Sequence, residues 1–311
     1  MQKKIMDVTY ILKTQISNPK PFCTCTENIE RDQKFPIRLS MYRNQRREGR
    51  ENNYGYYGHT KRKALSNYVV TRMKKKNRND YMDKNFLKVI DDSTPFVYFP
   101  LHQMPERELL IASPFNTNQI ETIKHIAKSL PIGYRLFVKE HPSQVTREWR
   151  DISFYEEILS IPNVQLLHYS IKSEDILKKC SLVITIHGAV GLEAAIHKKP
   201  AIIFSDFFYS ILPSVHKLQS IEELPSAIRS SLRTKVHASD VDKFLNLLEE
   251  NSIDFDLFGF EVDYHNYFFN EGNLLNVEID EGKAKQFIKK HESSFDMLAD
   301  EFIKKMQKIE K

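Results

Sequence analysis

Residues 182–206 read LVITIHGAVGLEAAIHKKPAIIFSD and contain two short β-branched runs separated by an amphipathic segment. The runs 182–187 and 201–205 have the length and composition of buried strands, and 189–197 has helical length and spacing. Parallel strands are joined by such crossover helices, because the chain has to return to the same end of the sheet. The stretch therefore predicts a β–α–β unit of a parallel sheet.

The same alternation begins at Phe96 and predicts one doubly wound, parallel, Rossmann-like α/β domain. Asn116 or Thr117 is expected to cap its first helix, and Glu174 and Asp175 favour the start of the third. The strands expected before the quoted unit are 96–101, 134–139 and 164–168. Besides 189–197, the expected helices are 61–75, 117–129, 153–160, 173–180, 220–232, 239–250 and 282–309.

Three regions are expected along the 311 residues. Residues 1–85 lack clear periodicity outside the one expected helix and form a basic N-terminal region. Residues 86–235 hold the expected sheet with its helices. Residues 236–311 are expected to form a C-terminal helical region.

The sequence favours a cytoplasmic location, with any membrane contact peripheral at the inner membrane face. No run approaches the roughly 18 apolar residues that span a bilayer, and the N-terminus is interrupted by charge before a signal peptide could form. Cysteine is limited to Cys23, Cys25 and Cys180, which gives neither a disulfide framework nor the paired ligands of a zinc site.

Polar side chains gather where the expected strands end. In open parallel sheets, ligands bind outside the carboxyl ends of the strands, where side chains and helix N-termini converge. Four strand ends with polar or charged side chains on one edge therefore predict a ligand site. The candidates are His102 and Glu106 after the first strand, Lys139, Glu140, His141 and Pro142 after the second, His187, Gly188, Gly191 and Glu193 after the fourth, and Ser205 after the fifth.

The turn 187–193 suits the phosphate of a nucleotide. Gly188 lets the backbone approach a ligand, and the following helix presents unpaired N–H groups at the positive end of its dipole. Glu193 would lie about one turn inside that helix, where it could accept hydrogen bonds from ribose hydroxyls. Structural roles stay open for these residues: a strand-end histidine or glycine can shape a turn, Pro142 can stop a strand, and Glu193 can complement the helix dipole.

Four motifs follow one another in a specific order: FPLHxxPE at 99–106, LFVKEHP at 136–142, PNVxLL at 162–167 and HGxxGLEAAxxKKPAIIF at 187–204. This order resembles the capsule polysaccharide biosynthesis proteins, a group that includes retaining Kdo transferases. The resemblance covers about residues 95–210. It implies the C-terminal nucleotide-binding domain of the GT-B fold, with residues 1–85 as a partial acceptor-side domain, because they show no β–α series.

The pair His141–Pro142 is similar to the HP motif of bacterial sialyl- and polysialyltransferases, in which the histidine contacts the CMP portion of the donor. The resemblance also implies that Gly188, Gly191 and Glu193 belong to the turn that closes on the donor phosphate and ribose. The family turn often begins with Ser or Thr, where this chain has His187.

The resemblance implies a glycosyltransferase that uses a nucleotide-activated sugar, with a CMP-linked sugar as one option, in capsule or other surface polysaccharide biosynthesis. Lys139 would offset phosphate charge, and Glu106, Glu140 and His102 are the candidates for the catalytic base. No cofactor is expected. Two alternatives stay open: a nucleotide-sugar epimerase-like enzyme, and a non-catalytic module that binds a glycan or a partner and derives from a transferase.

Two D-x-D sequences, 240–242 and 254–256, match the carboxylate pair that holds a divalent metal in another transferase fold. The first opens an expected helix after Ser239, which helix capping explains, and the second lies in an aromatic segment away from the strand ends. We therefore expect no metal site.

Basic residues concentrate between Arg31 and Arg78, where fifteen Lys or Arg accompany three acidic residues. Such a stretch can hold an anionic glycan, a lipid-linked acceptor at an acidic membrane face, or a nucleic-acid backbone, or it can simply be solvated. We expect a glycan or a membrane face, and nucleic acid is the least expected partner.

Overall fold

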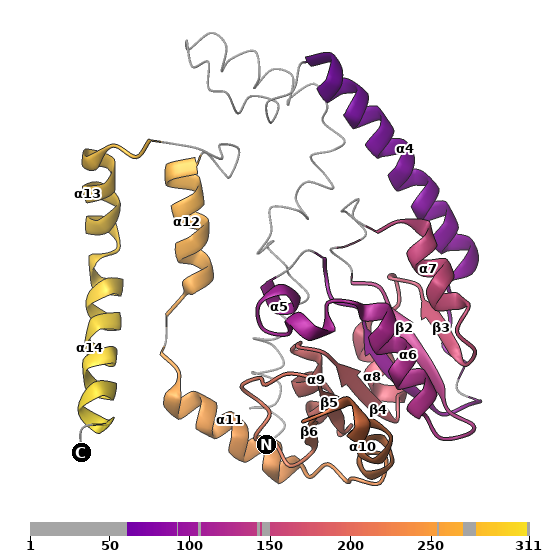
Figure 1. Ribbon diagram of the computed structural model, residues 1–311. Coiled ribbons are helices and arrows are strands. Elements are labelled where there is room, and N and C mark those ends of the chain that lie inside the picture. The colour runs from indigo at the N-terminus through magenta and orange to yellow at the C-terminus, as the bar shows by residue number, and fades with distance from the viewer. Residues whose placement is uncertain are drawn as a thin grey trace. The chain divides into compact units, whose positions relative to one another are not determined.

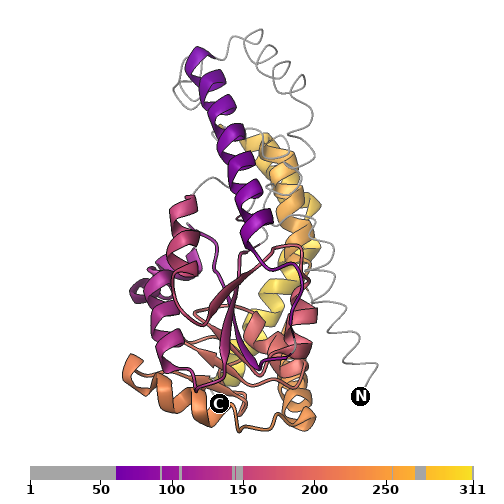
Figure 2. The same cartoon turned by 90° about the vertical axis from the view of Figure 1, so that its right-hand side faces the viewer.

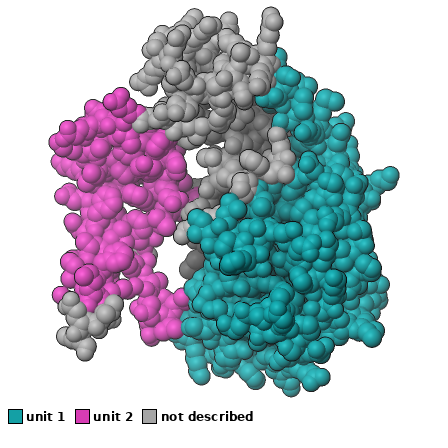
Figure 3. Space-filling model, in the orientation of Figure 1, with its two compact units in different colours: residues 1–14, 65–246 teal, residues 15–64, 247–311 magenta. Residues whose placement is uncertain are grey.

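The computed structural model describes residues 61–91, 93–104, 107–141, 144, 150–253, 255–269 and 278–309. Several residues singled out by the sequence lie outside the described part: Cys23, Cys25, the basic residues from Arg31 to Arg50, Glu106, Pro142 and Asp254. The chain divides into two compact units, and the described residues of the first begin at Leu65 and run to Asn246, whereas the second continues from Leu247 (Figure 3).

A six-stranded parallel sheet forms the centre of the first unit, with the strand order β3-β2-β1-β4-β5-β6. This is the order of a doubly wound Rossmann fold, and it reverses between the neighbouring strands β1 and β4. The predicted parallel α/β fold is confirmed. The strands are β1 (Phe96–Pro100), β2 (Arg135–Lys139), β3 (Val164–Leu167), β4 (Leu182–Thr185), β5 (Ala201–Ile203) and β6 (Val215–Lys217).

The sixth strand was not predicted from the sequence. Strand β6 has three residues, of which only Val215 is buried, so it lacks the apolar run that marks the other strands. Its position is set by pairing with β5, in which Ala201 aligns with Val215 and Ile203 with Lys217. An edge strand of this kind depends on its neighbour and leaves little pattern in the sequence.

Helices cover both faces of the sheet (Figure 1). Val97 and Phe99 of β1 belong to a core that includes residues of α6, α7 and α10, whereas Tyr98 points to the opposite face and hydrogen-bonds Ser173 of α8. Alternation along β1 thus divides its buried side chains between two layers. The helices of this unit include α5 (Arg107–Leu110), α6 (Gln119–Ser129), α7 (Ile152–Leu159), α8 (Ser173–Lys179), α9 (Val190–Ile196) and α10 (Leu224–Ser231), with short 3-10 turns η2 (Pro114–Asn116) and η4 (Ile221–Glu223).

The cap of α6 differs from the expectation. Asn118, rather than Asn116 or Thr117, precedes the helix, and its Oδ1 accepts a hydrogen bond from the backbone N–H of Glu121 at 3.4 Å. Pro114 begins a separate 3-10 turn that includes Asn116, so the chain turns once more before the helix starts.

Helix α4 (Lys61–Asn85) is ten residues longer than the segment expected at 61–75. Its C-terminal turns pack on the α/β body, because Met82 and Phe86 belong to the core beside α7 and the strands. Figure 2 shows the preceding turns of α4 projecting from that body. Most of the additional residues are polar, and Met82 among them is anchored in the core, with Phe86 directly after the helix.

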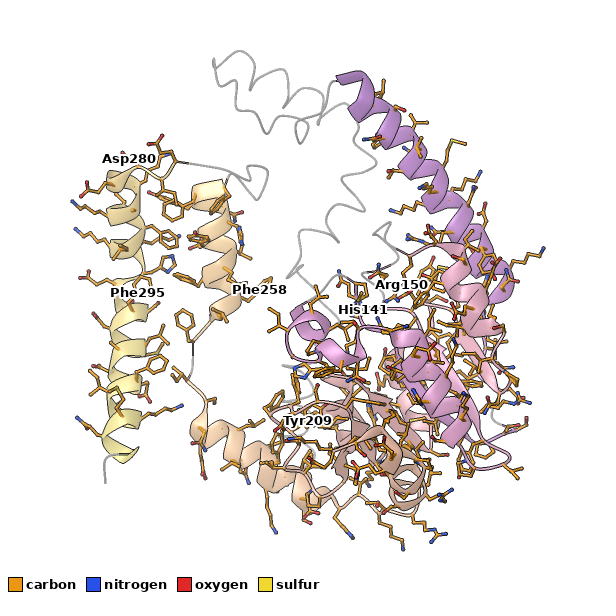
Figure 4. The ribbon with its side chains drawn as sticks, in the orientation of Figure 1. His141, Arg150, Tyr209, Phe258, Asp280 and Phe295 are labelled. Atoms are coloured by element: carbon orange, nitrogen blue, oxygen red, sulfur yellow. The ribbon has the colours of Figure 1, made fainter. Side chains whose placement is uncertain are left out.

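The second unit contains helices, as expected for the C-terminal region. Helix α11 (Ala238–Asn251) belongs to the first unit as far as Asn246 and to the second from Leu247, and α12 (Leu257–Phe269), α13 (Glu281–Lys290) and α14 (Glu292–Ile309) follow in the second unit. The single helix expected at 282–309 is divided at His291, and Asp280 caps α13 by accepting hydrogen bonds from two backbone N–H groups (Figure 4). The ring of Phe260 in α12 contacts Phe287 and Phe295.

Among the residues that the structure describes, no helix has both the length and the apolar character needed to cross a bilayer.

Candidate functional site

The carboxyl ends of β1, β2, β4 and β5 lie on one edge of the sheet, because all these strands are parallel. The structure places His102, His141, His187 and Ser205 directly beyond these four ends. The site is therefore centred on the β1–β4 boundary, where the strand order reverses. In doubly wound sheets this reversal opens the crevice in which ligands bind.

His102 and His187 meet across that boundary. The backbone N–H of His187 donates a hydrogen bond to Nε2 of His102 at 3.1 Å, and Oγ1 of Thr185 lies 3.5 Å from the same nitrogen. Burial lowers the pKa of His102, which is 8% exposed, to about 4. Near neutral pH the imidazole is therefore uncharged, and because Nε2 accepts, its hydrogen resides on Nδ1.

The main chain of His102 is held from two further elements. Gln119, at the start of α6, accepts from the His102 N–H at 2.8 Å and donates to the His102 carbonyl oxygen at 3.1 Å. Nη2 of Arg150 donates to the same carbonyl oxygen. Both side chains are buried, so the end of β1 has a defined position relative to α6 and to the segment before α7.

Glu140 is buried at the end of β2 and contacts three groups. Oε1 accepts from the backbone N–H of His141 at 2.7 Å, and Oε2 accepts from the hydroxyl of Tyr155 at 2.7 Å. Nε of Arg150 forms an ion pair with Oε2 at 3.0 Å. Burial raises the pKa of Glu140, whereas Arg150 and the hydrogen bonds lower it. The carboxylate is thus tied into the protein on both oxygens.

Arg150 connects the loops that carry His102 and His141, because it contacts both the His102 carbonyl oxygen and Glu140 (Figure 4). Its guanidinium carbon also lies 4.6 Å from the ring centroid of Phe154. A planar guanidinium carries five N–H donors that point in different directions, so it can make all these contacts at once. The compact ammonium group of a lysine could not replace it here.

Gln144 provides a second connection between the loops after β1 and β2. The side-chain Oε1 of Gln144 accepts from the backbone N–H of Met104 at 2.8 Å. The backbone N–H of Gln144 donates to the carbonyl oxygen of His141 at 2.9 Å. Gln144 is completely buried. The position of His141 is therefore determined by main-chain contacts to Glu140 and Gln144.

Lys139 and Glu193 lie below the edge, on the side of the sheet covered by α8 and α9. Nζ of Lys139 donates to Oγ of Ser173 at 3.1 Å. Burial lowers the pKa of Lys139 to about 8, and the negative charge of Glu193 partly opposes that effect. Burial raises the pKa of Glu193, which Lys139 opposes in turn. Lys139, which is buried, and Glu193, which is half-buried, each stabilise the charged form of the other.

His187 has a defined tautomer through Ser205. The hydroxyl of Ser205 donates to the carbonyl oxygen of Ile186 at 3.0 Å, and the same oxygen lies 2.8 Å from Nδ1 of His187. A hydroxyl has one hydrogen, so Nδ1 of His187 donates to Ser205 and Nε2 is the acceptor nitrogen of the neutral ring. The edge of this ring packs against Phe207 at a centroid distance of 4.3 Å.

Close packing requires glycine at position 191 and leaves little space beside Gly188. A Cβ at Gly191 would lie 2.5 Å from the hydroxyl oxygen of Tyr209, and a Cβ at Gly188 would lie 3.1 Å from Oγ1 of Thr185. The Tyr209 hydroxyl donates to the carbonyl oxygen of Gly188. Gly191 therefore makes room for a buried tyrosine that supports the turn, a structural role that the sequence had left open beside ligand binding.

Sequence reasoning missed the residues that hold the edge in place. Tyr209 belongs to the run FFY at 207–209, which follows the fifth strand and could have indicated packing against the glycine turn. The other missed residues come from elements far apart in sequence and match no motif. They are Gln119, Gln144, Arg150 and Tyr155.

The described residues contain no group of three or more His, Cys, Asp or Glu side chains placed to hold a metal ion. Asp240 lies in the first turn of α11, consistent with a role at a helix start. At the edge of the sheet, Asp206 pairs with Lys217 at 2.6 Å and accepts from Ser210, so its carboxylate has partners within the protein.

The sheet order defines a Rossmann-like, doubly wound α/β protein with a polar carboxyl edge. The family model described as "Capsule polysaccharide biosynthesis protein" matches residues 21–230. The chain belongs to this family, which confirms the resemblance found in its motifs. A search of curated proteins finds no match.

Solved structures similar to this chain include an epimerase and a glycosyltransferase. UDP-GlcNAc 2-epimerase from Methanocaldococcus jannaschii is 18% identical with a TM-score of 0.38, over 68% of this chain and 60% of the epimerase. The β-Kdo 2,7-transferase KpsC from Thermosulfurimonas dismutans is 17% identical with a TM-score of 0.33, over 57% of this chain and 62% of the transferase. The chain thus matches less than two thirds of the length of either protein.

Proposed function

We propose that this chain binds the nucleotide-activated sugar of a glycosyltransferase reaction in capsule or other surface polysaccharide biosynthesis. The observation that carries the proposal is the cluster of polar side chains from four strand ends at the β1–β4 reversal, joined by the hydrogen bond between His187 and His102. Doubly wound sheets bind nucleotides at this place. Membership of the capsule polysaccharide family supports the pathway.

In this proposal, His141 contacts the nucleotide, which is CMP if the HP pair acts as in the proteins it resembles. The turn from Gly188 to Glu193 faces the phosphate and the ribose. Lys139, on the side of the sheet covered by α8 and α9, offsets the negative charge of the phosphate. Residues 86–235 are the nucleotide-sugar domain, residues 1–85 a partial acceptor-side domain, and 236–311 a helical region.

Stabilisation of the departing phosphate by hydrogen-bond donors and positive charge is the proposed source of catalysis. His102 and Glu140 fit positioning roles better than proton transfer. His102 has a pKa of about 4 and uses Nε2 internally, and both carboxylate oxygens of Glu140 have partners. Glu106, outside the described residues, stays a candidate for the catalytic base.

A panel of CMP-, UDP- and GDP-sugars tests the proposal by thermal shift and by donor hydrolysis. A ligand that binds only the folded state raises the apparent stability by RT ln(1 + [L]/Kd), which is about 2.7 kcal/mol at a concentration of 100 Kd. We expect one nucleotide class to raise the Tm and to be hydrolysed or transferred. Absence of a shift with every nucleotide sugar at millimolar concentration would contradict donor binding.

The substitution His141→Ala locates the nucleotide. Loss of one hydrogen bond costs roughly 0.5–1.5 kcal/mol, so we expect the affinity to fall about twofold to twelvefold, with the Tm of the free protein retained. The matched control is His125→Ala on the exposed face of α6. Calorimetry that gives equal affinity for the two variants would assign His141 a structural role only.

A further inference from the structure

Helix α4 has an unusual concentration of positive charge. Residues 61–78 contain eight Lys or Arg and no Asp or Glu. Arg72, Lys74 and Lys76 are exposed in the described part of this helix. Arg78, in contrast, is buried, and its charge lowers the pKa of Glu140 at the end of β2.

The same helix exposes large apolar side chains. Leu65, Val69 and Met73 are spaced four residues apart and are 53%, 48% and 62% exposed. Residues four apart lie on one side of a helix, so the three side chains form a continuous apolar stripe. Single exposed apolar residues are ordinary, but a contiguous stripe on a helix marks an interaction surface.

Basic and apolar side chains share this stripe. At about 100° per residue, Arg72 and Lys76 fall within the same narrow sector of the helix as Leu65, Val69 and Met73. A helix that lies in a membrane interface separates its charged face from its apolar face, because the apolar face enters the acyl region. The mixed stripe of α4 is unsuited to that arrangement.

A polymer that offers negative charge and apolar patches side by side fits the stripe better. An anionic polysaccharide has this chemistry, because each sugar ring presents C–H groups on its faces and carries its carboxylate or phosphate at the rim. Lysine and arginine stems can pack on such rings while their charged ends meet the anionic groups. Nucleic acid would supply the charge, but the five positions carry no aromatic side chain for base stacking, and the neighbouring Tyr68 is half-buried with its hydroxyl accepting from Arg72 at 3.2 Å.

We propose that the α4 stripe, formed by Leu65, Val69, Arg72, Met73 and Lys76, binds an anionic polysaccharide as the acceptor. Naming this ligand the acceptor rests on the proposed function, whereas binding itself needs no donor. The position of α4 supports the assignment, because its buried Arg78 acts on Glu140, whose carboxylate holds the backbone N–H of His141. The stripe therefore belongs to a helix whose C-terminal part packs, through Met82, on the α/β body that carries the proposed donor edge.

The test uses the full chain, a fluorescent polygalacturonate oligosaccharide as the anionic glycan, and anisotropy at fixed ionic strength. Arg72→Gln/Lys76→Gln should weaken binding about twofold to thirtyfold, the loss expected when two exposed ion pairs are removed. Lys283→Gln/Lys289→Gln on α13 removes the same charge from another exposed helix and should change the affinity less than twofold. Leu65→Ser/Met73→Ser leaves the charge intact and should also weaken binding.

Competition identifies the class of ligand. Unlabelled polygalacturonate should displace the labelled oligosaccharide, whereas phosphatidylglycerol vesicles and a random oligonucleotide at equal charge should not. Equal weakening by the α4 and α13 double variants, or displacement by vesicles or oligonucleotide alone, would overturn the proposal. The thermal shift with nucleotide sugars is measured on the same variants, so a failure of the glycan surface remains distinguishable from a failure of donor binding.

Discussion

The backbone N–H of His187 donates to Nε2 of His102 at 3.1 Å and joins the ends of β4 and β1 where the strand order reverses. Because Nε2 is used in this way, the ring carries its hydrogen on Nδ1, a buried nitrogen that has no hydrogen-bond partner in the described part of the chain. The junction therefore depends on a neutral imidazole.

The neutral state of His102 predicts acid sensitivity. As pH falls from 6.5 towards 4, the unfolded chain binds a proton that the folded chain does not, so the free energy of unfolding falls. The total loss in the free energy of unfolding from His102 is about 3 kcal/mol, and below pH 4 it increases no further. Urea unfolding between pH 7 and pH 4.5 should show a shallower pH dependence for His102→Gln than for the wild type.

The control for this measurement is His125→Gln, which removes an exposed imidazole on α6 and should leave the pH dependence as in the wild type. Long-range proton–nitrogen NMR provides a second readout on the wild type if His102→Gln does not fold. A resonance of His102 that shows the imidazolium form at pH 6 would contradict the prediction.

Gly191→Ala should destabilise the protein by about 1–3 kcal/mol, because the new methyl group would overlap the ring of Tyr209. The double variant Gly191→Ala/Tyr209→Ala removes the overlap, so its loss of stability should be smaller than the sum of the two single losses. Urea denaturation of the four proteins measures this coupling. Strict additivity would show that Tyr209 does not restrict residue 191.

Arg150→Met should cost about 3–5 kcal/mol, because it leaves the buried carboxylate of Glu140 without its cation. Replacing both partners, as Glu140→Gln/Arg150→Met, should recover part of that loss. The same variants should lower nucleotide affinity together with stability, since Arg150 also holds the His102 carbonyl oxygen. A double variant less stable than Arg150→Met would argue against the ion pair as the main contact.

Transfer or hydrolysis of the donor should be independent of divalent metal. Two carboxylates at the described part of the edge have protein partners, since Glu140 pairs with Arg150 and Asp206 with Lys217. Phosphate charge is then met by N–H groups and basic side chains. We expect this activity to persist in EDTA. If EDTA abolishes the activity and manganese restores it, the prediction is wrong and the two D-x-D sequences become candidate metal ligands.

The sequence by itself determined the parallel sheet and its polar carboxyl edge. Buried strands such as 182–185 and 135–139 are encoded locally by apolar runs, and the residues that follow them must lie at one edge once the strands are parallel. The motif order likewise identified the family, because it depends only on residues along the chain.

Only the tertiary structure decided what those edge residues contact. The contact of Arg150 with the His102 carbonyl oxygen, the tautomers of His102 and His187, and the space that Gly191 leaves for Tyr209 each join segments distant in sequence. Local periodicity contains no information on such pairs, because they arise when loops from different strands pack against one another. The same reason explains β6 and the length of α4, which depend on neighbours rather than on their own residues.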